Sequence, residues 1–501
     1  MRPPDRFLWH DYETFGADPA RDRPAQFAAL ATDGELRVLG DPQVWYCQPT
    51  AEVLPHPEAV LLTGITPQRA RREGLAEPDF ARQVLAAFSP AGTCGAGYNT
   101  LRFDDEFTRH LLYRTFHDPY EREWRGGNSR WDLIDAVRLW QALRPEGLVW
   151  PRREDGAVSF RLEHLAAANG LHHARAHDAL SDVEATLALA RRLREAQPRL
   201  YAHALKLRDK RFAASLIDLE QMTPLVHVSA KIPASRGCLA LMAPLAAHPQ
   251  LTNAVLAFDL HSDPQALIEL PLEELRERVF IASRDLPEEI DRVPVKGLHL
   301  NRVPMLAPLS TLRAEDAQRW GLDLDRAERH REQLLAARET LRPKLAALFR
   351  REPGPIPDAE LALYGGGFLD AADRALLARV RSAAPEALAG LQAAFGDPRY
   401  RELLFRHRAR HHPHTLDAEE ARRWRGWQRR RLTRDEDPRQ LTLARYQALL
   451  DPALWPAATP AQQALLAELR AWPAEAGLLD LLEQAEADEA TAGPIRADAT
   501  D

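Results

Sequence analysis

The chain has 501 residues, too many for one hydrophobic core, and we expect about two to four domains. Hydrophobic residues make up 45% and charged residues 28%, as in an ordinary globular protein. The 66 Lys+Arg and 73 Asp+Glu residues give a net charge of -7, which excludes a uniformly basic nucleic-acid coat. A locally basic groove is still compatible with this balance.

Cysteine usage and hydropathy indicate the compartment. Cys47, Cys94 and Cys238 are odd in number and widely spaced, so they form neither a disulfide framework nor a zinc site. No apolar run reaches 18 residues, and no apolar signal segment follows the first charges. We therefore expect a soluble, cytoplasmic protein with no membrane segment.

The first predicted element is a buried strand, Phe7 to Thr14, into which two carboxylates are set at Asp11 and Glu13. Side chains alternate along a strand, so these carboxylates share one face, roughly 7 Å apart. Two unpaired anions in a poorly solvated place repel each other strongly, and a divalent metal with oxygen ligands is the best candidate to hold them. For an isolated Asp-x-Glu, a turn cap or an arginine pair is the commoner explanation.

The region up to about Gln197 mixes strands and helices, and its glycines match neither a dinucleotide-binding nor a phosphate-loop motif. The last helix of this region buries an apolar stripe and leaves Asp182 off it, near its N-terminal end. The other expected elements are a hairpin of 26–32 and 36–39 around Asp33-Gly34, a strand at 44–47, a helix after Thr66-Pro67, a helix over 80–88, a strand at 94–99, and helices opening at 102–107 and 160–165.

The sequence divides into further regions beyond a boundary near 197–198. Short strands at 225–229, 239–243, 254–260 and 293–298, followed by a helical stretch over 314–350, predict a β-rich domain. A Pro-rich linker follows at 352–357, and helical periodicity then predicts a helical domain. The expected domains are 6–197, 198–351 and 355–485, followed by an acidic, disordered tail at 486–501.

Four carboxylates and one histidine stand at the starts of elements or on the first strand: Asp11, Glu13, Asp104, His177 and Asp182. Several anionic oxygens from separate elements suit a hydrolase that holds two Mg²⁺ ions about 4 Å apart. Such a site also needs a group that takes a proton from water, and a histidine with a pKa of about 6.5 serves this purpose near neutral pH.

This order of motifs resembles the DEDD exonuclease superfamily in its histidine-containing branch (DEDDh). The first strand carries Asp-x-Glu, Phe103-Asp104 opens a later helix, and His177 precedes Asp182 by five positions. The chain more closely resembles the bacterial exonuclease I family, over nearly its whole length. The segments that carry this resemblance are 10–16, 22–29, 63–67, 128–133, 160–165, 224–229 and 364–373.

The resemblance implies a multidomain α/β fold: a ribonuclease H-like (DEDDh) exonuclease domain with a mixed sheet, an SH3-like β domain and a C-terminal helical domain, closing a C-shaped clamp. It implies a Mg²⁺-dependent 3′→5′ exodeoxyribonuclease, with Mn²⁺ as a substitute, that degrades single-stranded DNA to 5′-mononucleotides in DNA repair and recombination. It also implies a monomer that binds the acidic tail of single-stranded DNA-binding protein.

Motif positions carry the family's catalytic roles onto this sequence. By this resemblance Asp11 bridges both metals, Glu13 and Asp182 hold one each, Asp104 completes the set, and His177 is the general base. Glu13 also contacts the terminal 3′-hydroxyl, and another substrate contact is implied at Arg161. The Phe-Asp and His-x-x-x-x-Asp spacings of the family select Asp104 and Asp182, and they exclude the nearby carboxylates Asp105 and Asp178.

The DNA path is implied in the same way, since a single strand is held by cations and by aromatic stacking. The matching positions are Arg109, Tyr120, Trp124 and Arg138 in the first domain and Lys210, Asn253, Lys296 and Asn301 in the middle domain. The run 422–431, with Trp424 and Trp427, fits either a DNA surface or a solvated helix whose tryptophans turn inward.

Two other functions are compatible with parts of this pattern. One is an enzyme of the same superfamily that acts on RNA or short oligonucleotides, although short substrates do not need additional clamp domains. The other is a DNA-binding scaffold with an inactive nuclease site, although all five catalytic residue types are present.

Overall fold

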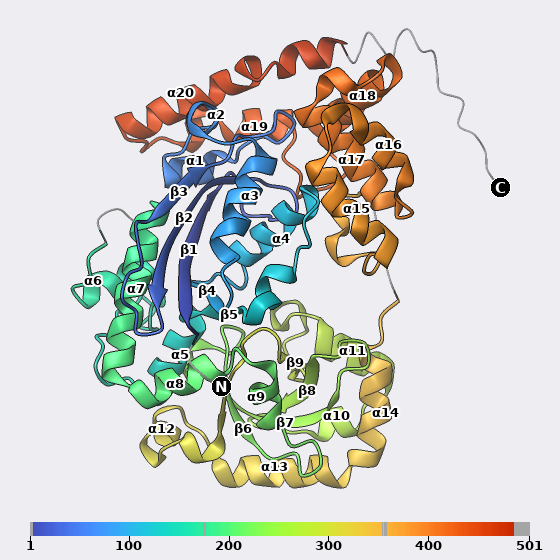
Figure 1. Ribbon diagram of the computed structural model, residues 1–501. Coiled ribbons are helices and arrows are strands. Elements are labelled where there is room, and N and C mark those ends of the chain that lie inside the picture. Colours follow the sequence, from blue (N-terminus) through green and yellow to red (C-terminus); the bar gives the residue numbers. More distant parts are fainter. Residues whose placement is uncertain (1–3, 174–176, 353, 355–357, 485–501) are drawn as a thin grey trace, which may run out of the picture.

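A computed structural model describes residues 4–173, 177–352, 354 and 358–484. It consists of a first domain built on a mixed sheet, a middle domain built on a second sheet, and a set of C-terminal helices (Figure 1). Part of the predicted linker and the whole tail 486–501 lie outside the described residues. Within those ranges, no helix combines the length and the apolar character that crossing a membrane requires.

The sheet of the first domain has the order β3-β2-β1-β4-β5. Strands β1, β2 and β3 pair antiparallel, whereas β4 and β5 run parallel to β1. This confirms a mixed sheet with the predicted carboxylate strand at its centre. The strands are β1 (Arg6–Thr14), β2 (Pro24–Asp33), β3 (Gln43–Tyr46), β4 (Thr93–Gly97) and β5 (Ser129–Asp132).

Alternation along β1 separates two buried clusters. Leu8 and Tyr12 pack with α3 and α4 on one face of the sheet, and Phe7 and Trp9 pack with α5 and α7 on the other. Asp11 and Glu13 therefore continue the face that α7 covers. The helices of this part are α1 (Pro57–Thr63), α2 (Pro67–Glu73), α3 (Glu77–Phe88), α4 (Asp104–Arg114), α5 (Leu133–Leu143), α6 (Leu162–Ala168), α7 (Ala179–Ala196), α8 (Pro198–Lys206) and α9 (Lys210–Ser215).

The predicted hairpin around Asp33-Gly34 is wrong in its second arm. Residues 36–39 form a single bridge, Thr32 with Val38, because Leu36 has a φ of 65° and its side chain turns into the core. A left-handed residue interrupts an extended strand. The true partner of β2 on that side is β3, which matches the strand expected at 44–47.

The middle domain is built on an antiparallel sheet of order β10-β6-β7-β8-β9. Four of its strands match the expected segments. The fifth, β10, was missed because it is four residues long and ends in a proline. The elements are β6 (Leu225–Val228), β7 (Leu239–Ala247), β8 (Ala254–Asp259), α10 (Gln265–Glu269), α11 (Leu272–Phe280), β9 (Val295–His299), β10 (Met305–Pro308), α12 (Ala314–Arg319), α13 (Leu324–Ala336) and α14 (Arg338–Phe349).

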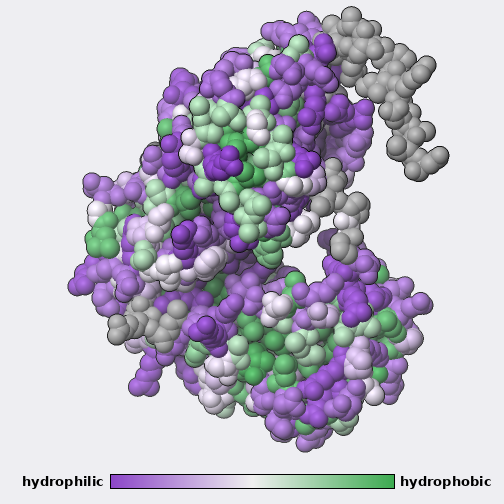
Figure 2. Space-filling view, turned by 45° about the vertical axis from the view of Figure 1, so that its right-hand side comes forward, coloured by the Kyte–Doolittle hydropathy of each residue, from purple (hydrophilic) through white to green (hydrophobic). Residues whose placement is uncertain are grey.

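The C-terminal part is helical, as its periodicity predicts. Helix α20 packs across α1 and α2 (Figure 1). The surface is hollowed between the middle domain and the rest of the molecule (Figure 2). The helices are α15 (Ala371–Ser382), α16 (Leu388–Ala394), α17 (Pro398–His411), α18 (Ala418–Thr433), α19 (Leu443–Leu449) and α20 (Pro460–Glu475).

A buried ion-pair cluster joins these helices to the first domain. Glu360 accepts from Arg23 at 2.8 Å and from Arg410 at 2.5 Å, and Arg410 also donates to Glu52 at 2.6 Å. All four side chains are nearly inaccessible to solvent. Buried charges that are paired on both sides hold two surfaces together, so the C-terminal helices form a fixed wall of the first domain.

Candidate active site

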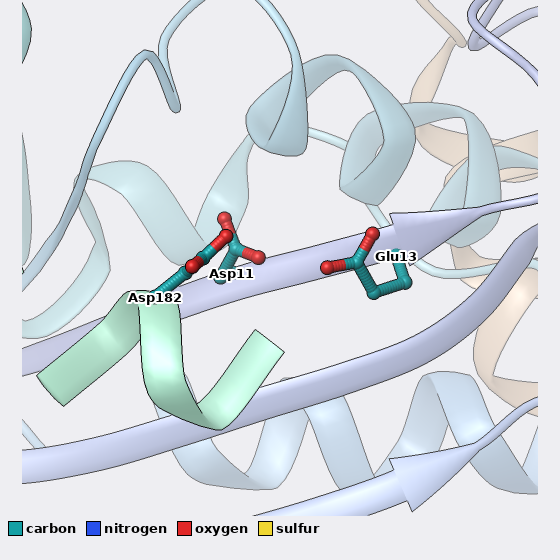
Figure 3. A group of neighbouring side chains, drawn as sticks. All are labelled: Asp11, Glu13 and Asp182. Carbon is teal, nitrogen blue, oxygen red and sulfur yellow. The ribbon is translucent and has the colours of Figure 1, made fainter. Parts of the chain in front are cut away.

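Strand β1 and helix α7 bring together three carboxylates that are far apart in the sequence. Oxygen atoms of Asp11, Glu13 and Asp182 all lie within 4.8 Å of one another (Figure 3). Asp11 and Glu13 point from the same face of β1, and Asp182 points toward them from the first turn of α7. The described part of the chain contains this one group with the spacing of a metal site.

Asp104 is the first residue of α4 and approaches the same place from the opposite side of β1. Its side chain is 2% exposed, and Oδ1 accepts a hydrogen bond of 2.8 Å from the Tyr12 amide, between the two carboxylates of the strand. Asp104, Asp11, Glu13 and Asp182 line one cavity. The four predicted carboxylates thus converge, although Asp104 lies outside the group of three.

Burial and mutual repulsion disfavour negative charge in this cavity. Burial, followed by the neighbouring carboxylates, raises the pKa of Asp11 well above its ordinary value and that of Glu13 to about 8. Burial also raises the pKa of Asp104 to about 8. Clustered oxygen donors of this kind fit hard divalent cations, whose charge would compensate the repulsion.

Two histidines border the site. His177 lines the same cavity as the carboxylates and has a φ of 62°. His173, which the sequence analysis missed, places Nε2 at 2.5 Å from Asp182 Oδ1. The five-position spacing selected His177, and nothing in the sequence marks His173 as a partner of Asp182.

The carboxylates that the motif spacing excluded have structural partners. Asp105 is buried and paired with Arg122 at 2.5 Å and Arg130 at 2.9 Å, and these arginines lower the pKa of its carboxyl group. Asp178 is the N-cap of α7 and accepts from the Ser181 amide at 3.2 Å. Neither carboxylate belongs to the group of three.

A glycine and an aspartate shape the cavity walls. A Cβ atom at Gly16 would lie 2.2 Å from Asp22 Oδ2, so only glycine fits there. Asp132 caps α5 and also accepts from the amides of Asn99 at 2.8 Å and Leu101 at 3.1 Å. The predicted motif around Asp132 therefore supports the loop that faces the carboxylates.

A second cavity, lined by five basic and five acidic side chains, opens from the same carboxylates. It has a volume of about 1340 Å³ and shares Asp11 and Asp182 with the first. Arg161 lies on its wall as the exposed residue before α6, and Arg138 lies there paired with Asp135 at 2.8 Å. These predicted contacts flank the carboxylates.

The other predicted DNA contacts of the first domain differ in exposure. Trp124 is 63% exposed, with its ring available for stacking. Arg109 is buried and donates to Glu123 at 2.8 Å and to Glu106 at 2.7 Å, under the ring of Tyr120. Its guanidinium is already engaged, so Arg109 has a structural part in this conformation.

The middle-domain candidates make three contacts. Lys296 Nζ lies 2.8 Å from His227 Nε2, and burial lowers the pKa of this lysine to about 8. Lys210 donates to Asn253 Oδ1 at 3.3 Å. Asn301 is exposed, and its carbonyl accepts from Arg130 of the first domain.

The arginine-rich run 422–431 lies on α18. Trp424 is 8% exposed and stacks on Trp427 with ring centroids 4.9 Å apart, and Arg406 lies over the Trp427 ring. The tryptophans turn inward. Of the two explanations open for this run, the structure favours a solvated helix that buries its aromatic side.

Comparisons with known proteins agree with this fold and site. Family profiles match three consecutive segments: Exonuclease at 8–190, Exonuclease I SH3-like domain at 208–351, and Exonuclease I C-terminal domain at 357–476. The fold and the carboxylate site thus define an exonuclease, and the predicted combination of three domain types is confirmed.

Individual relatives are more specific. Exodeoxyribonuclease I of Escherichia coli K12 is 48% identical over 424 residues, which cover 83% of this chain and 88% of that protein. Exodeoxyribonuclease I of Haemophilus influenzae is 44% identical over 85% of this chain and 90% of that protein. The structure of Exonuclease I from Methylocaldum szegediense has a TM-score of 0.89 and 47% sequence identity to this chain. E. coli Exonuclease I in complex with a dA16 oligonucleotide has a TM-score of 0.87 and 44% identity. Each of the two similarities covers 94% of this chain and 99% of the known structure. The chain belongs to the exodeoxyribonuclease I family and is an exodeoxyribonuclease.

Proposed function

We propose that this protein removes nucleotides from the 3′ end of single-stranded DNA by Mg²⁺-dependent hydrolysis and releases 5′-mononucleotides. The observation that carries the proposal is the convergence of Asp11, Glu13 and Asp182 to within 4.8 Å, beside a cavity that Arg138 and Arg161 also line. The structures of E. coli Exonuclease I with oligonucleotides such as dA16 and dT13 support the choice of a single strand as substrate.

The donor set favours Mg²⁺, with Mn²⁺ as a substitute. All four candidate ligands, Asp11, Glu13, Asp104 and Asp182, offer carboxylate oxygens, which suit hard cations better than soft ones. A zinc-bound form of the E. coli protein is known, so the test must compare metals. When bound, two such ions supply charge neutralisation for an in-line displacement at phosphorus.

The chain's own residues would divide the remaining work. His177 takes the proton from the attacking water, Glu13 orients the terminal 3′-hydroxyl, and Arg161 contacts the substrate from the wall of the cavity of about 1340 Å³. The other proposed DNA contacts are Tyr120, Trp124, Arg138, Lys210, Asn253, Lys296 and Asn301. Arg109 would join them only by giving up its contacts with Glu106 and Glu123.

The cellular setting is proposed from family membership and composition. We assign the protein to DNA repair and recombination in the cytoplasm, and its three buried free cysteines are compatible with a reducing compartment. It would act as a monomer, since a clamp closes around DNA without a second copy, and would bind the acidic tail of single-stranded DNA-binding protein. The boundaries 6–197, 198–351 and 355–485 are retained for its domains.

End-labelled DNA and RNA strands, incubated with Mg²⁺ or with EDTA, test the proposal. We expect mononucleotides from DNA with metal only, and losses of orders of magnitude in rate for Asp11→Asn and Asp182→Asn with thermal unfolding unchanged in its cooperativity. Glu184→Gln, an exposed carboxylate two positions beyond Asp182 on α7, is the matched control. Equal cleavage of RNA would favour an RNA-directed enzyme, and binding without cleavage would favour an inactive scaffold.

The same assay shows which of the two histidines, His173 or His177, acts as the general base. If His177 is the base, His177→Gln lowers the rate by about 10²–10⁴-fold, the usual contribution of general-base catalysis. His173→Gln then has a much smaller effect on the rate at saturating Mg²⁺. The reverse order would move the proton transfer to His173.

A further inference from the structure

Two consecutive carboxylates at the start of α4 have different partners. Asp104 accepts a hydrogen bond from the Tyr12 amide of β1, whereas Asp105 accepts from two buried arginines. The N-cap of this helix is Phe103, whose side chain has no oxygen, so no side-chain capping bond fixes the helix end. The contacts of the two carboxylates therefore hold the first turn of α4 in place.

We infer that Arg130 is a positioning residue for Asp104: it holds Asp105, and with it the first turn of α4, in the orientation that turns Asp104 toward the other catalytic carboxylates. This inference rests on the proposed function, in which Asp104 is a metal ligand. Arg130 lines neither the cavity of the carboxylates nor the cavity of about 1340 Å³ beside it. It acts through its neighbours, and it sets how tightly the carboxylates hold a divalent cation.

The Arg130 guanidinium uses each of its nitrogens. Nη1 donates to Asp105 Oδ2 at 2.9 Å, Nε lies 3.1 Å from Glu123 Oε2, and Nη2 donates to the Asn301 carbonyl at 3.3 Å. The Arg130 side chain is 8% exposed, and its two carboxylate partners are buried as deeply. Because a guanidinium is planar and rigid, partners in three directions fix both its position and its rotation.

The three partners of Arg130 come from three different segments. Asp105 is in α4, Glu123 is in the short helix η1 (Glu121–Glu123), and Asn301 is in the turn between β9 and β10 of the middle domain. Arg130 itself is on β5, in the same sheet as the catalytic carboxylates of β1. One side chain thus ties the start of α4 to that sheet and to the middle domain.

Arg122 completes the grip on Asp105. It donates to Asp105 Oδ1 at 2.5 Å, so the two arginines hold the two oxygens of one buried carboxylate. This carboxylate cannot rotate without breaking a charge-assisted hydrogen bond. A lysine at position 130 would keep the charge but not the planar fork, so Arg130→Lys tests the geometry of the contact rather than its charge.

Mn²⁺ binding to the metal-free protein, measured by calorimetry without DNA, tests the inference. We expect Arg130→Lys to weaken Mn²⁺ binding by about 10-fold, the lower end of the usual effect of changing a residue that orients metal ligands. Asp105→Asn should also weaken it. If Arg130 acts through Asp105, the double variant loses no more affinity than the more affected single variant. Additive losses would give Arg130 a separate route to the metal and overturn the inference.

Arg114→Lys is the matched control. Arg114 lies in the last turn of the same helix, its side chain is 1% exposed, and it donates to the buried Glu77 at 2.7 Å. Both lysine variants disturb a buried ion pair and should lower the Tm, but only Arg130→Lys should change the affinity for Mn²⁺. Unchanged binding in Arg130→Lys, or an equal change in both variants, would overturn the inference. Should Arg130→Lys fail to fold, Asp105→Asn is compared with Arg114→Lys in the same way.

Hydrolysis of single-stranded DNA is measured separately. In Arg130→Lys the Mg²⁺ concentration that gives half the maximal rate should rise by about 10-fold, while saturating Mg²⁺ restores most of the rate, because the metal ligands themselves remain. A parent protein that fails to cleave DNA, but whose Mn²⁺ affinity depends on Arg130, would refute the proposed function and leave the inference standing. A parent protein that cleaves DNA with a Mn²⁺ affinity independent of Arg130 would do the reverse.

Discussion

Neutralising one catalytic carboxylate should stabilise the metal-free protein while it abolishes activity. Burial and the facing carboxylates raise the pKa of Glu13 to about 8, from an ordinary value of 4.5. The folded state therefore holds a proton that the unfolded state has released, and stability that is present below about pH 4.5 is lost as the pH rises through about 8. Glu13→Gln removes this loss.

The magnitude follows from the pKa difference. Each pH unit between the two pKa values removes about 1.4 kcal/mol, so at about pH 7 retaining the Glu13 proton in the folded state costs about 3 kcal/mol relative to the ionised unfolded state. The neighbouring carboxyl groups share protons with Glu13 and relieve part of this cost, so we expect a gain of about 2 kcal/mol from Glu13→Gln. For a unit the size of the first domain this corresponds to a rise in Tm of about 4–8 °C.

Thermal unfolding in EDTA measures this gain at about pH 5 and about pH 8. Glu13→Gln should unfold at a higher temperature than the parent at pH 8, with little difference at pH 5. Saturating Mg²⁺ should raise the Tm of the parent more than that of the variant, because ligand binding stabilises only a protein that retains the site. Glu58→Gln, an exposed carboxylate at the cavity rim, should change stability by no more than about 0.5 kcal/mol. A variant less stable than the parent at pH 8 would refute this account of the site.

Three further predictions concern other residues. Asp105→Ala leaves Arg122 buried without its carboxylate and Arg130 with Glu123 alone, so we expect a loss of about 3–5 kcal/mol in the free energy of unfolding; a loss below 1 kcal/mol would contradict a structural part for Asp105. Glu360→Ala should destabilise by a similar amount and make the C-terminal helices the first site of limited proteolysis; uniform cleavage would show that the cluster does not join the domains. Trp124→Ala should weaken binding of a fluorescent single strand by about 1–3 kcal/mol with Tm unchanged, and unaltered affinity would remove this ring from the DNA path.

The catalytic carboxylates could be predicted because local rules place them. Strand alternation puts Asp11 and Glu13 on one face, and the helix-start position of Asp182 leaves it off the apolar stripe that packs on the sheet. The choice between Asp104 and Asp105 came from motif register, and the structure gives its physical basis. Asp105 points to two arginines, whereas Asp104 points to the Tyr12 amide in the strand.

Contacts that depend on long-range packing could not be predicted. The contact of His173 with Asp182 joins two side chains nine positions apart that match no known motif spacing used in the sequence analysis. Leu36 has a left-handed backbone conformation that leucine rarely adopts, so the sequence gives no sign of it. Because of this conformation, residues 36–39 do not form the expected strand. Arg109 has the composition of a DNA contact, but its two glutamate partners lie on α4 and the segment after it, and the sequence does not reveal that pairing.

One contact beside the catalytic cavity depends most on distant packing. Arg21 and Asp437 are separated by 416 positions, yet their contact holds the loop that places Arg439 on the wall of the cavity lined by Asp11 and Glu13. Neither Arg21 nor Asp437 lines that cavity, so weakening their contact should leave the chemical step unchanged and affect the steps that move the strand or the product. Asp437→Asn should therefore lower steady-state turnover while the rate of the first cleavage, measured by rapid quench, is unchanged, and an equal loss in both rates would place this contact in the chemical step instead.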